Sequence, residues 1–229
     1  MQNPITLIGR SHEIEKLDTL LTSSQAEFLV VYGRRRVGKT FLIRQHLKNH
    51  IAFDITGTHG AAREQQLTNF YTECLKRKKG KHKMQPPATW HEAFSCLAAL
   101  LKTLPKKKTK QVVFIDEMPW LDTAKSEFIP ALEFFWNQHI SKMNNLLLIA
   151  CGSASSWIKK KLINARGGLH NRVTERLRLL PFNLYETEVF LKTKGITLPH
   201  YQLLELYMAM GGIPFYLNQV SKGKSSMQL

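Results

Sequence analysis

The sequence has few cysteines, no long apolar run and no leader-like segment. Its three cysteines, Cys74, Cys96 and Cys151, have no C-x-x-C spacing, which argues against a disulfide framework and against a zinc knuckle. Apolar runs such as residues 146–151 are strand-sized, far below the roughly eighteen residues of a membrane span. Residues 1–6 lack the basic and apolar regions of a secretory signal. We therefore expect a cytoplasmic protein with no membrane partner.

Carboxylates are also scarce. The 229 residues include 33 Lys and Arg but only 17 Asp and Glu, which gives a formal net charge of +16. With 43% hydrophobic residues the chain can bury a substantial core, and this composition excludes disorder. The charge favours a polyanionic partner without identifying it. His46 and His50 are four residues apart but lack the Glu of an H-E-x-x-H motif, so we predict no metal site there.

Helical and strand patterns alternate along the chain, which predicts an α/β fold with a largely parallel sheet. Ser11 is predicted to cap a helix whose apolar side chains, Ile14, Leu17 and Leu20 among them, share one face. Further helices are predicted from about residue 38, over 61–77, 90–103, 128–140 and 155–163, and from 184 onward. Strands are predicted at 28–32, 51–55, 112–115, 146–151 and 176–180.

A glycine-rich segment separates the first predicted strand from its helix. Residues 33–40 read Gly-Arg-Arg-Arg-Val-Gly-Lys-Thr and fit the Walker A pattern G-x-x-x-x-G-K-T. The glycines let the backbone curl so that its N–H groups point at phosphate oxygens, and the helix adds the positive end of its dipole. Lys39 would reach the β- and γ-phosphates, and Thr40 would ligate Mg²⁺. The segment predicts a nucleotide-binding P-loop.

An acidic pair ends a buried strand further along the chain. Asp116 and Glu117 follow the apolar run 112–115, at the strand end where α/β sheets bind their ligands. Asp116 would hold Mg²⁺, and Glu117 would orient and polarise the water that attacks the γ-phosphate. This Walker B arrangement, together with the P-loop, predicts an enzyme that hydrolyses a nucleoside triphosphate.

The order of these motifs resembles the AAA+ superfamily, and within it the archaeal-type AAA/STAND P-loop ATPases. The similarity covers essentially the whole chain. It is carried by five segments: Ile8-Gly9-Arg10-x-x-Glu13-x-x-x-Leu17, residues 33–40, Phe114-Ile115-Asp116-Glu117-Met118-Pro119-Trp120-Leu121, Cys151-Gly152-Ser153 and Gly211-Gly212-Ile213-Pro214-Phe215-Tyr216-Leu217.

The resemblance implies a fold and a set of ligands. It implies a three-layer α/β/α P-loop core with a parallel five-stranded sheet over residues 1–182. A helical lid would follow over residues 183–229, truncated before the output domains that relatives often carry, such as a winged helix and a nuclease-like domain. The ligands implied are ATP or ADP with Mg²⁺, and the expected nucleotide contacts are Ile8, Arg10, Gly33, Arg34, Arg35, Arg36, Val37, Gly38, Lys39, Thr40, Phe41 and Pro214.

Three further residues take roles from the resemblance, each with a plainer alternative. Ser153 matches the sensor of the γ-phosphate, or it caps the next helix. Arg172 matches the arginine finger, supplied by a neighbouring copy or by an output domain, or it is a solvated loop arginine with which Arg166, Arg176 and Arg178 compete. Pro214 matches the G-x-P signature of the lid, or it simply begins a helix. The expected catalytic set is therefore Lys39, Glu117, Ser153 and Arg172.

The leading hypothesis is an Mg²⁺-dependent ATP-binding module that hydrolyses ATP and acts as a nucleotide-controlled switch. A small-molecule kinase is a weaker hypothesis, because the acidic pair and Ser153 favour transfer to water. A GTPase is disfavoured because the chain has no N-K-x-D tetrapeptide. The non-enzymatic alternative is a nucleic-acid-binding module that uses the basic runs 76–83, 106–110 and 159–161, with ATP as a gating or structural ligand.

The nucleic-acid alternative makes a distinct prediction. Phosphate contacts carry no base information and release counterions, so affinity for DNA or RNA should fall steeply with salt and show little sequence preference. Fluorescence anisotropy of labelled oligonucleotides over a salt series measures both properties. Binding that ignores salt, or no binding at low salt, would exclude this alternative.

Overall fold

The computed structural model describes residues 7–77, 85–105, 109–164, 169 and 171–222. A five-stranded sheet in the order β2-β3-β4-β1-β5 lies at its centre, and every neighbouring pair of strands is parallel. The strands are β1 Glu27–Tyr32, β2 Ile51–Thr56, β3 Gln111–Asp116, β4 Leu146–Gly152 and β5 Glu175–Arg178. The parallel sheet predicted from the alternating pattern is confirmed.

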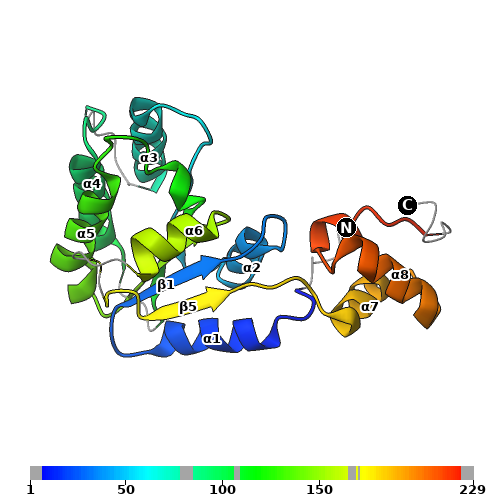
Figure 1. The fold of residues 1–229 in the computed structure, drawn as a ribbon. Coiled ribbons are helices and arrows are strands. Elements are labelled where there is room, and N and C mark those ends of the chain that lie inside the picture. Colours follow the sequence, from blue (N-terminus) through cyan, green and yellow to red (C-terminus); the bar gives the residue numbers. More distant parts are fainter. Residues whose placement is uncertain (1–6, 78–84, 106–108, 165–168, 170, 223–229) are drawn as a thin grey trace.

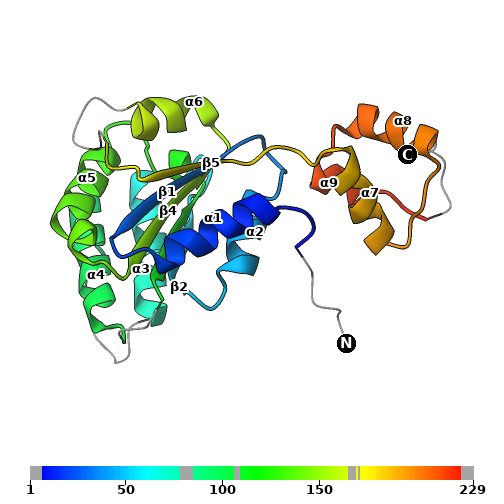
Figure 2. The same cartoon turned by 90° about the horizontal axis from the view of Figure 1, so that it is seen from below.

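Helices cover both faces of the sheet (Figure 1, Figure 2). Strand side chains alternate between the two layers, so that Phe28 and Val30 face one core while Leu29 and Val31 face the other. One layer holds α1 (Ser11–Thr22) and α2 (Lys39–His46). The other holds α3 (Arg63–Arg77), α4 (Trp90–Thr103), α5 (Phe128–Gln138) and α6 (Ser155–Ile158). Burial on both faces explains why the strands read as continuous apolar runs.

Three predicted boundaries need correction. Helix α1 begins at Ser11 itself, after Arg10 in a left-handed conformation with φ 64°, so Ser11 does not act as the cap. Strand β5 ends at Arg178 because its partner β1 ends opposite, at Tyr32. The helix expected over 155–163 is α6 followed by a π-helical turn, Lys159–Ile163.

The remaining helices form a second, smaller cluster. They are α7 (Leu184–Thr193), α8 (His200–Met210) and α9 (Pro214–Leu217). Their apolar side chains, Leu191, Leu206 and Leu217 among them, pack on one another as a core separate from the two that flank the sheet. These C-terminal helices lie beyond the carboxyl ends of β1 and β5 (Figure 1).

A tight backbone contact attaches the C-terminal helices to the segment that follows β5. Gly212 accepts a hydrogen bond from the Phe182 N–H at 2.8 Å and has φ 66°. A Cβ at Gly212 would collide with the carbonyl oxygen of Phe182. Its neighbour Gly211 has nearly the same φ, 64°, but a Cβ there would have no atom within 4 Å. Position 212 is therefore restricted to glycine by contact as well as by conformation.

This pair gives a matched stability test. Each alanine substitution adds the cost of a left-handed residue, about 1 kcal/mol. Gly212→Ala should lower the free energy of unfolding by a further ~1–3 kcal/mol because of the added clash. Thermal and urea denaturation of the two variants measure the difference, and equal losses would contradict the close contact.

Candidate functional site

The carboxyl ends of the central strands gather the predicted site residues at one edge of the sheet. The register pairs Tyr32 of β1 with Gly152 of β4, and Ile115 of β3 with Ala150 of β4. The glycine-rich loop, the acidic pair and Ser153 follow directly after these residues. Segments more than one hundred residues apart in the sequence thus meet at a single edge.

The glycine-rich loop ends at the start of α2. Gly38 has φ 94°, a conformation that suits glycine, and it is the N-cap of α2. Lys39 is buried, and its ammonium group donates to the carbonyl oxygens of Gly33 and Arg34 at 3.0 Å each. The first N–H groups of α2 have no partner within the helix. A buried cation and a helix N-terminus therefore share one loop, which is an arrangement suited to anions.

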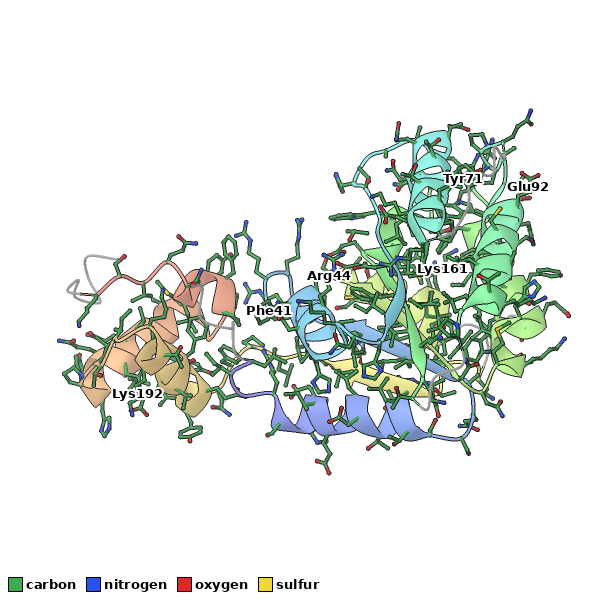
Figure 3. The ribbon with its side chains drawn as sticks, turned by 180° about the vertical axis from the view of Figure 1, so that it is seen from behind. Phe41, Arg44, Tyr71, Glu92, Lys161 and Lys192 are labelled. Carbon is green, nitrogen blue, oxygen red and sulfur yellow. The ribbon has the colours of Figure 1, made fainter. Side chains whose placement is uncertain are left out.

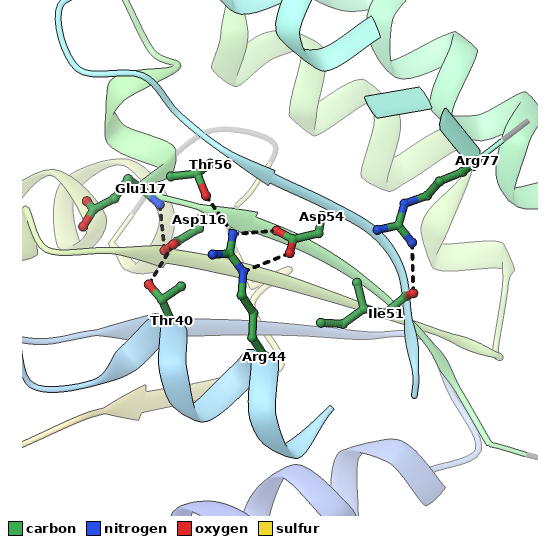
Figure 4. Close-up of polar contacts among 8 residues, drawn as sticks. All are labelled: Thr40, Arg44, Ile51, Asp54, Thr56, Arg77, Asp116 and Glu117. Atoms are coloured by element: carbon green, nitrogen blue, oxygen red, sulfur yellow. Dashed lines mark hydrogen bonds and ion pairs between the residues drawn. The ribbon is translucent and has the colours of Figure 1, made fainter. Parts of the chain in front are cut away.

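Asp116 connects this loop helix to the centre of the sheet (Figure 4). One carboxylate oxygen accepts from the Thr40 hydroxyl at 2.7 Å, and the other accepts from the Glu117 backbone N–H at 3.0 Å. A hydroxyl and a carboxylate are hard oxygen donors of the kind that Mg²⁺ prefers, and neighbouring ligands of an octahedral Mg²⁺ lie about 3 Å apart. The Thr40 and Asp116 oxygens fit such a pair of ligands.

Glu117 is held in an unusual conformation. Its backbone is left-handed, with φ 41° and ψ 45°, which is costly for a non-glycine residue. One of its carboxylate oxygens accepts from the Ser153 N–H at 3.2 Å and from the Ser153 hydroxyl at 3.0 Å. Ser153 therefore fixes Glu117, and the alternative reading of Ser153 as a helix cap is wrong, because α6 follows Ala154 and has no side-chain cap.

Arg10 joins three parts of the molecule. Its buried guanidinium donates to the carbonyl oxygen of Val37 in the glycine-rich loop at 3.2 Å, pairs with Glu13 at 3.4 Å, and lies 4.7 Å from the centre of the Phe182 ring. Burial lowers the pKa of Arg10, and the nearby carboxylates of Glu13 and Glu186 partly offset this effect. Ile8, two residues earlier, is half-buried in the same segment.

The other predicted contacts lie around the mouth of the loop. Arg34, Arg35 and Arg36 are exposed, as is Phe41 on α2 (Figure 3). Pro214 is the first residue of α9. The ring of the next residue, Phe215, stacks on Arg36. The loop and the C-terminal helices are thus in contact.

Arg172 lies away from this group. It is exposed and precedes β5, where Thr174 donates to Phe28 near the start of β1. The loop begins at the opposite end of β1, about 17 Å away at the rise of an extended strand. Arg172 does not reach the loop of its own chain.

The sequence did not predict a role for the arginine on α2. Arg44, one turn after Thr40, makes a bidentate pair with Asp54 of β2 at 2.9 and 3.0 Å and donates to Thr56 at 2.9 Å (Figure 4). The hydrogen bond with Asp54 raises the pKa of Arg44. The pair ties the loop helix to the edge strand and borders a polar cavity of about 520 Å³ at that edge. The i, i+4 spacing from Thr40 was visible in the sequence, but the partner was not.

Other expectations concern metals, membranes and the basic runs. The described ranges contain no cluster of three or more His, Cys, Asp or Glu that could hold a metal ion. No helix in the same ranges is long and apolar enough to cross a membrane. Most of the basic segments 76–83 and 106–110 lie outside the described residues, whereas Lys159, Lys160 and Lys161 are exposed on the π-helical turn.

The sheet order, the loop between β1 and α2 and the acidic end of β3 define a P-loop α/β protein. Comparison with known families narrows this class. Residues 7–220 match the model of the ATPase domain found predominantly in Archaea. The chain belongs to this family of ATPase domains, as the sequence resemblance predicted.

Individual relatives agree with this assignment. An uncharacterized protein of Methanocaldococcus jannaschii is 26% identical over 93% of this chain and 44% of its own length, so the chain spans less than half of that relative. An uncharacterized ATP-binding protein of the same organism is 39% identical over 21% of this chain and 83% of its own length.

Solved structures share the fold at low sequence identity. A Walker-type ATPase of Pyrococcus abyssi superposes with a TM-score of 0.69 at 21% identity, covering 95% of this chain and 68% of that one. The ORC2 protein of Aeropyrum pernix, solved in ADPNP and ADP complexes, gives 0.59 at 16% identity over 91% and 58% of the two chains. A STAND protein of Pyrococcus horikoshii gives 0.55 at 18% identity over 96% and 31%. The three-layer α/β/α P-loop fold is thereby confirmed.

The cysteine beside the acidic pair provides a test of the local environment. Burial, together with the nearby Asp116, raises the pKa of Cys151 well above its ordinary value, and burial raises the pKa of Cys74 to about 12. Both thiols should remain protonated, and therefore unreactive, up to about pH 9. Iodoacetamide should modify the partly exposed Cys96 before the two buried cysteines. Intact-mass analysis over time measures the order of modification. Rapid modification of Cys151 in the native protein would contradict the packing, and all three should react in denaturant.

Proposed function

We propose that the chain binds Mg²⁺-ATP at the carboxyl edge of the sheet, hydrolyses it, and uses the nucleotide to set the position of residues 183–229 as a lid on a core of residues 1–182. The observation that carries this proposal is a connected set of hydrogen bonds: Thr40 and the Glu117 N–H donate to Asp116, and Ser153 donates to Glu117. It joins the predicted phosphate loop, metal ligand, base and sensor in one place.

The roles follow from the chemistry of each group. The N–H groups of the loop and the Lys39 ammonium would bind the phosphates. Thr40 and Asp116 would hold Mg²⁺, which supplies charge neutralisation on the phosphate oxygens when bound. Glu117 accepts a proton from the attacking water as its oxygen bonds to the γ-phosphorus and the bond to the ADP oxygen breaks. Ser153 positions the Glu117 carboxylate for that step.

Arg172 fits this scheme only between molecules. Because it lies far from the loop of its own chain, an arginine-finger role requires a second copy or another domain that presents the guanidinium to the γ-phosphate. The proposal therefore includes a low rate of hydrolysis for the isolated chain.

The decisive experiment combines calorimetry of ATP and ADP binding in Mg²⁺ with an assay of phosphate release. Glu117→Gln should keep nucleotide binding and lose about 10²- to 10⁴-fold in hydrolysis, because the amide cannot take the proton. Lys39→Ala should lose ATP affinity itself, because the cation beside the phosphates is gone.

The outcomes separate the parts of the proposal. Unchanged ATP affinity in Lys39→Ala would overturn the assignment of the phosphate site. Binding without hydrolysis in the wild type would leave a nucleotide-held switch and remove hydrolysis by the isolated chain from the proposal. Absence of binding would direct attention to the basic surface.

A further inference from the structure

The third arginine of the glycine-rich loop lies against the C-terminal helices. The guanidinium carbon of Arg36 is 4.4 Å from the centre of the Phe215 ring and 5.5 Å from that of Tyr216. The same guanidinium donates to the Tyr216 hydroxyl at 3.1 Å. The two rings stand 5.7 Å apart at an interplanar angle of 79°. They form an aromatic corner, defined here as Phe215 and Tyr216, that receives one cation.

Arg36 also has an unusual backbone conformation. Arg36 has φ 69°, a left-handed conformation that is costly for a non-glycine side chain. Arg34 and Arg35 precede it in the same exposed loop, and among the described residues neither side chain has a hydrogen bond, ion pair or ring contact with the C-terminal helices. The contact is therefore specific to the third arginine.

A second arginine, Arg10, also links the glycine-rich loop to the start of the C-terminal helices. Arg10 donates to Val37, the residue after Arg36, and lies over Phe182 at the entrance to the C-terminal helices. Its backbone N–H also reaches the Glu186 carboxylate of α7 at 3.5 Å. Arg36 thus contacts the C-terminal helices directly, and the next residue, Val37, is linked to Phe182 through Arg10.

We propose that Arg36 and the aromatic corner form a latch that holds the C-terminal helices over the phosphate loop and slows the release of bound nucleotide. This inference rests on the proposed function, because it concerns the regulation of that same site. Lids that close over a bound ligand commonly set the rate of its release. Arg36 is therefore a positioning residue that acts through the lid.

The first measurement is the dissociation rate of a fluorescent ADP analogue, followed by stopped-flow fluorescence. Arg36→Gln loses the cation–π contacts and the hydrogen bond to Tyr216, and should speed release by about five- to thirty-fold. Phe215→Ala loses only its own cation–π contact and should give a smaller increase of about two- to five-fold. Tyr216→Phe removes only the hydroxyl and should give a smaller increase. Tyr201→Ala, on an exposed residue of α8, is the matched control and should release the analogue at the wild-type rate.

Double variants test whether the residues act together. Arg36→Gln combined with Phe215→Ala should be no faster than the faster single variant, because both remove the same contact. Arg35→Gln combined with Phe215→Ala should show independent effects. The latch proposal would be wrong if the effects of Arg36→Gln and Phe215→Ala on the dissociation rate were additive. It would also be wrong if both single variants released the analogue at the wild-type rate.

A second readout requires no nucleotide. Hydrogen exchange of α9 and of residues 179–183 should be faster in Arg36→Gln than in wild type, while exchange in the sheet stays the same. If the wild type does not bind the analogue but Arg36→Gln still exchanges faster than the wild type, the contact stands and the proposed function fails. If binding is intact and neither exchange nor release changes, the latch fails and the proposed function stands.

Discussion

The structure depends on the burial of both faces of a parallel sheet. Since all five strands run in one direction, every loop that leaves a carboxyl end emerges at the same edge. The edge collects the glycine-rich loop after β1, the acidic pair after β3 and Ser153 after β4. The chemistry of the site is therefore a consequence of sheet packing: the apolar strand residues fix the register, and the register fixes which polar groups meet.

Polar contacts at this edge then fix the conformations of the acidic residues that the sheet brings together. Asp116 receives hydrogen bonds on both carboxylate oxygens, and Glu117 is retained in a left-handed conformation by its neighbours. Strained residues persist where the surrounding structure determines them fully, and they are common at functional sites. Arg44 adds a tether between α2 and β2 that keeps Thr40 opposite Asp116.

Part of the excess positive charge forms contacts inside the protein. Arg10, Arg36 and Arg44 each contact protein partners, and each joins two elements that are distant in the sequence. A planar guanidinium can bond to a carbonyl or carboxylate and stack on an aromatic ring at the same time, which an ammonium cannot do as well. Part of the positive charge therefore serves contacts within the protein around the loop, and the expected polyanionic partner stays a prediction.

The sequence by itself determined the elements, the parallel class of the sheet and the positions of the loop and the acidic pair, because those features depend on local patterns and on spacing. Only the tertiary structure decided which groups touch. The Glu117–Ser153 contact, the Arg44–Asp54 pair and the Arg36 stacking on Phe215 join residues 10 to 179 positions apart. Such contacts are set by the packing of whole elements, which no local pattern encodes. For the same reason the sequence could match Arg172 to the position of an arginine finger, whereas the fold places it just before the start of β5, away from the glycine-rich loop.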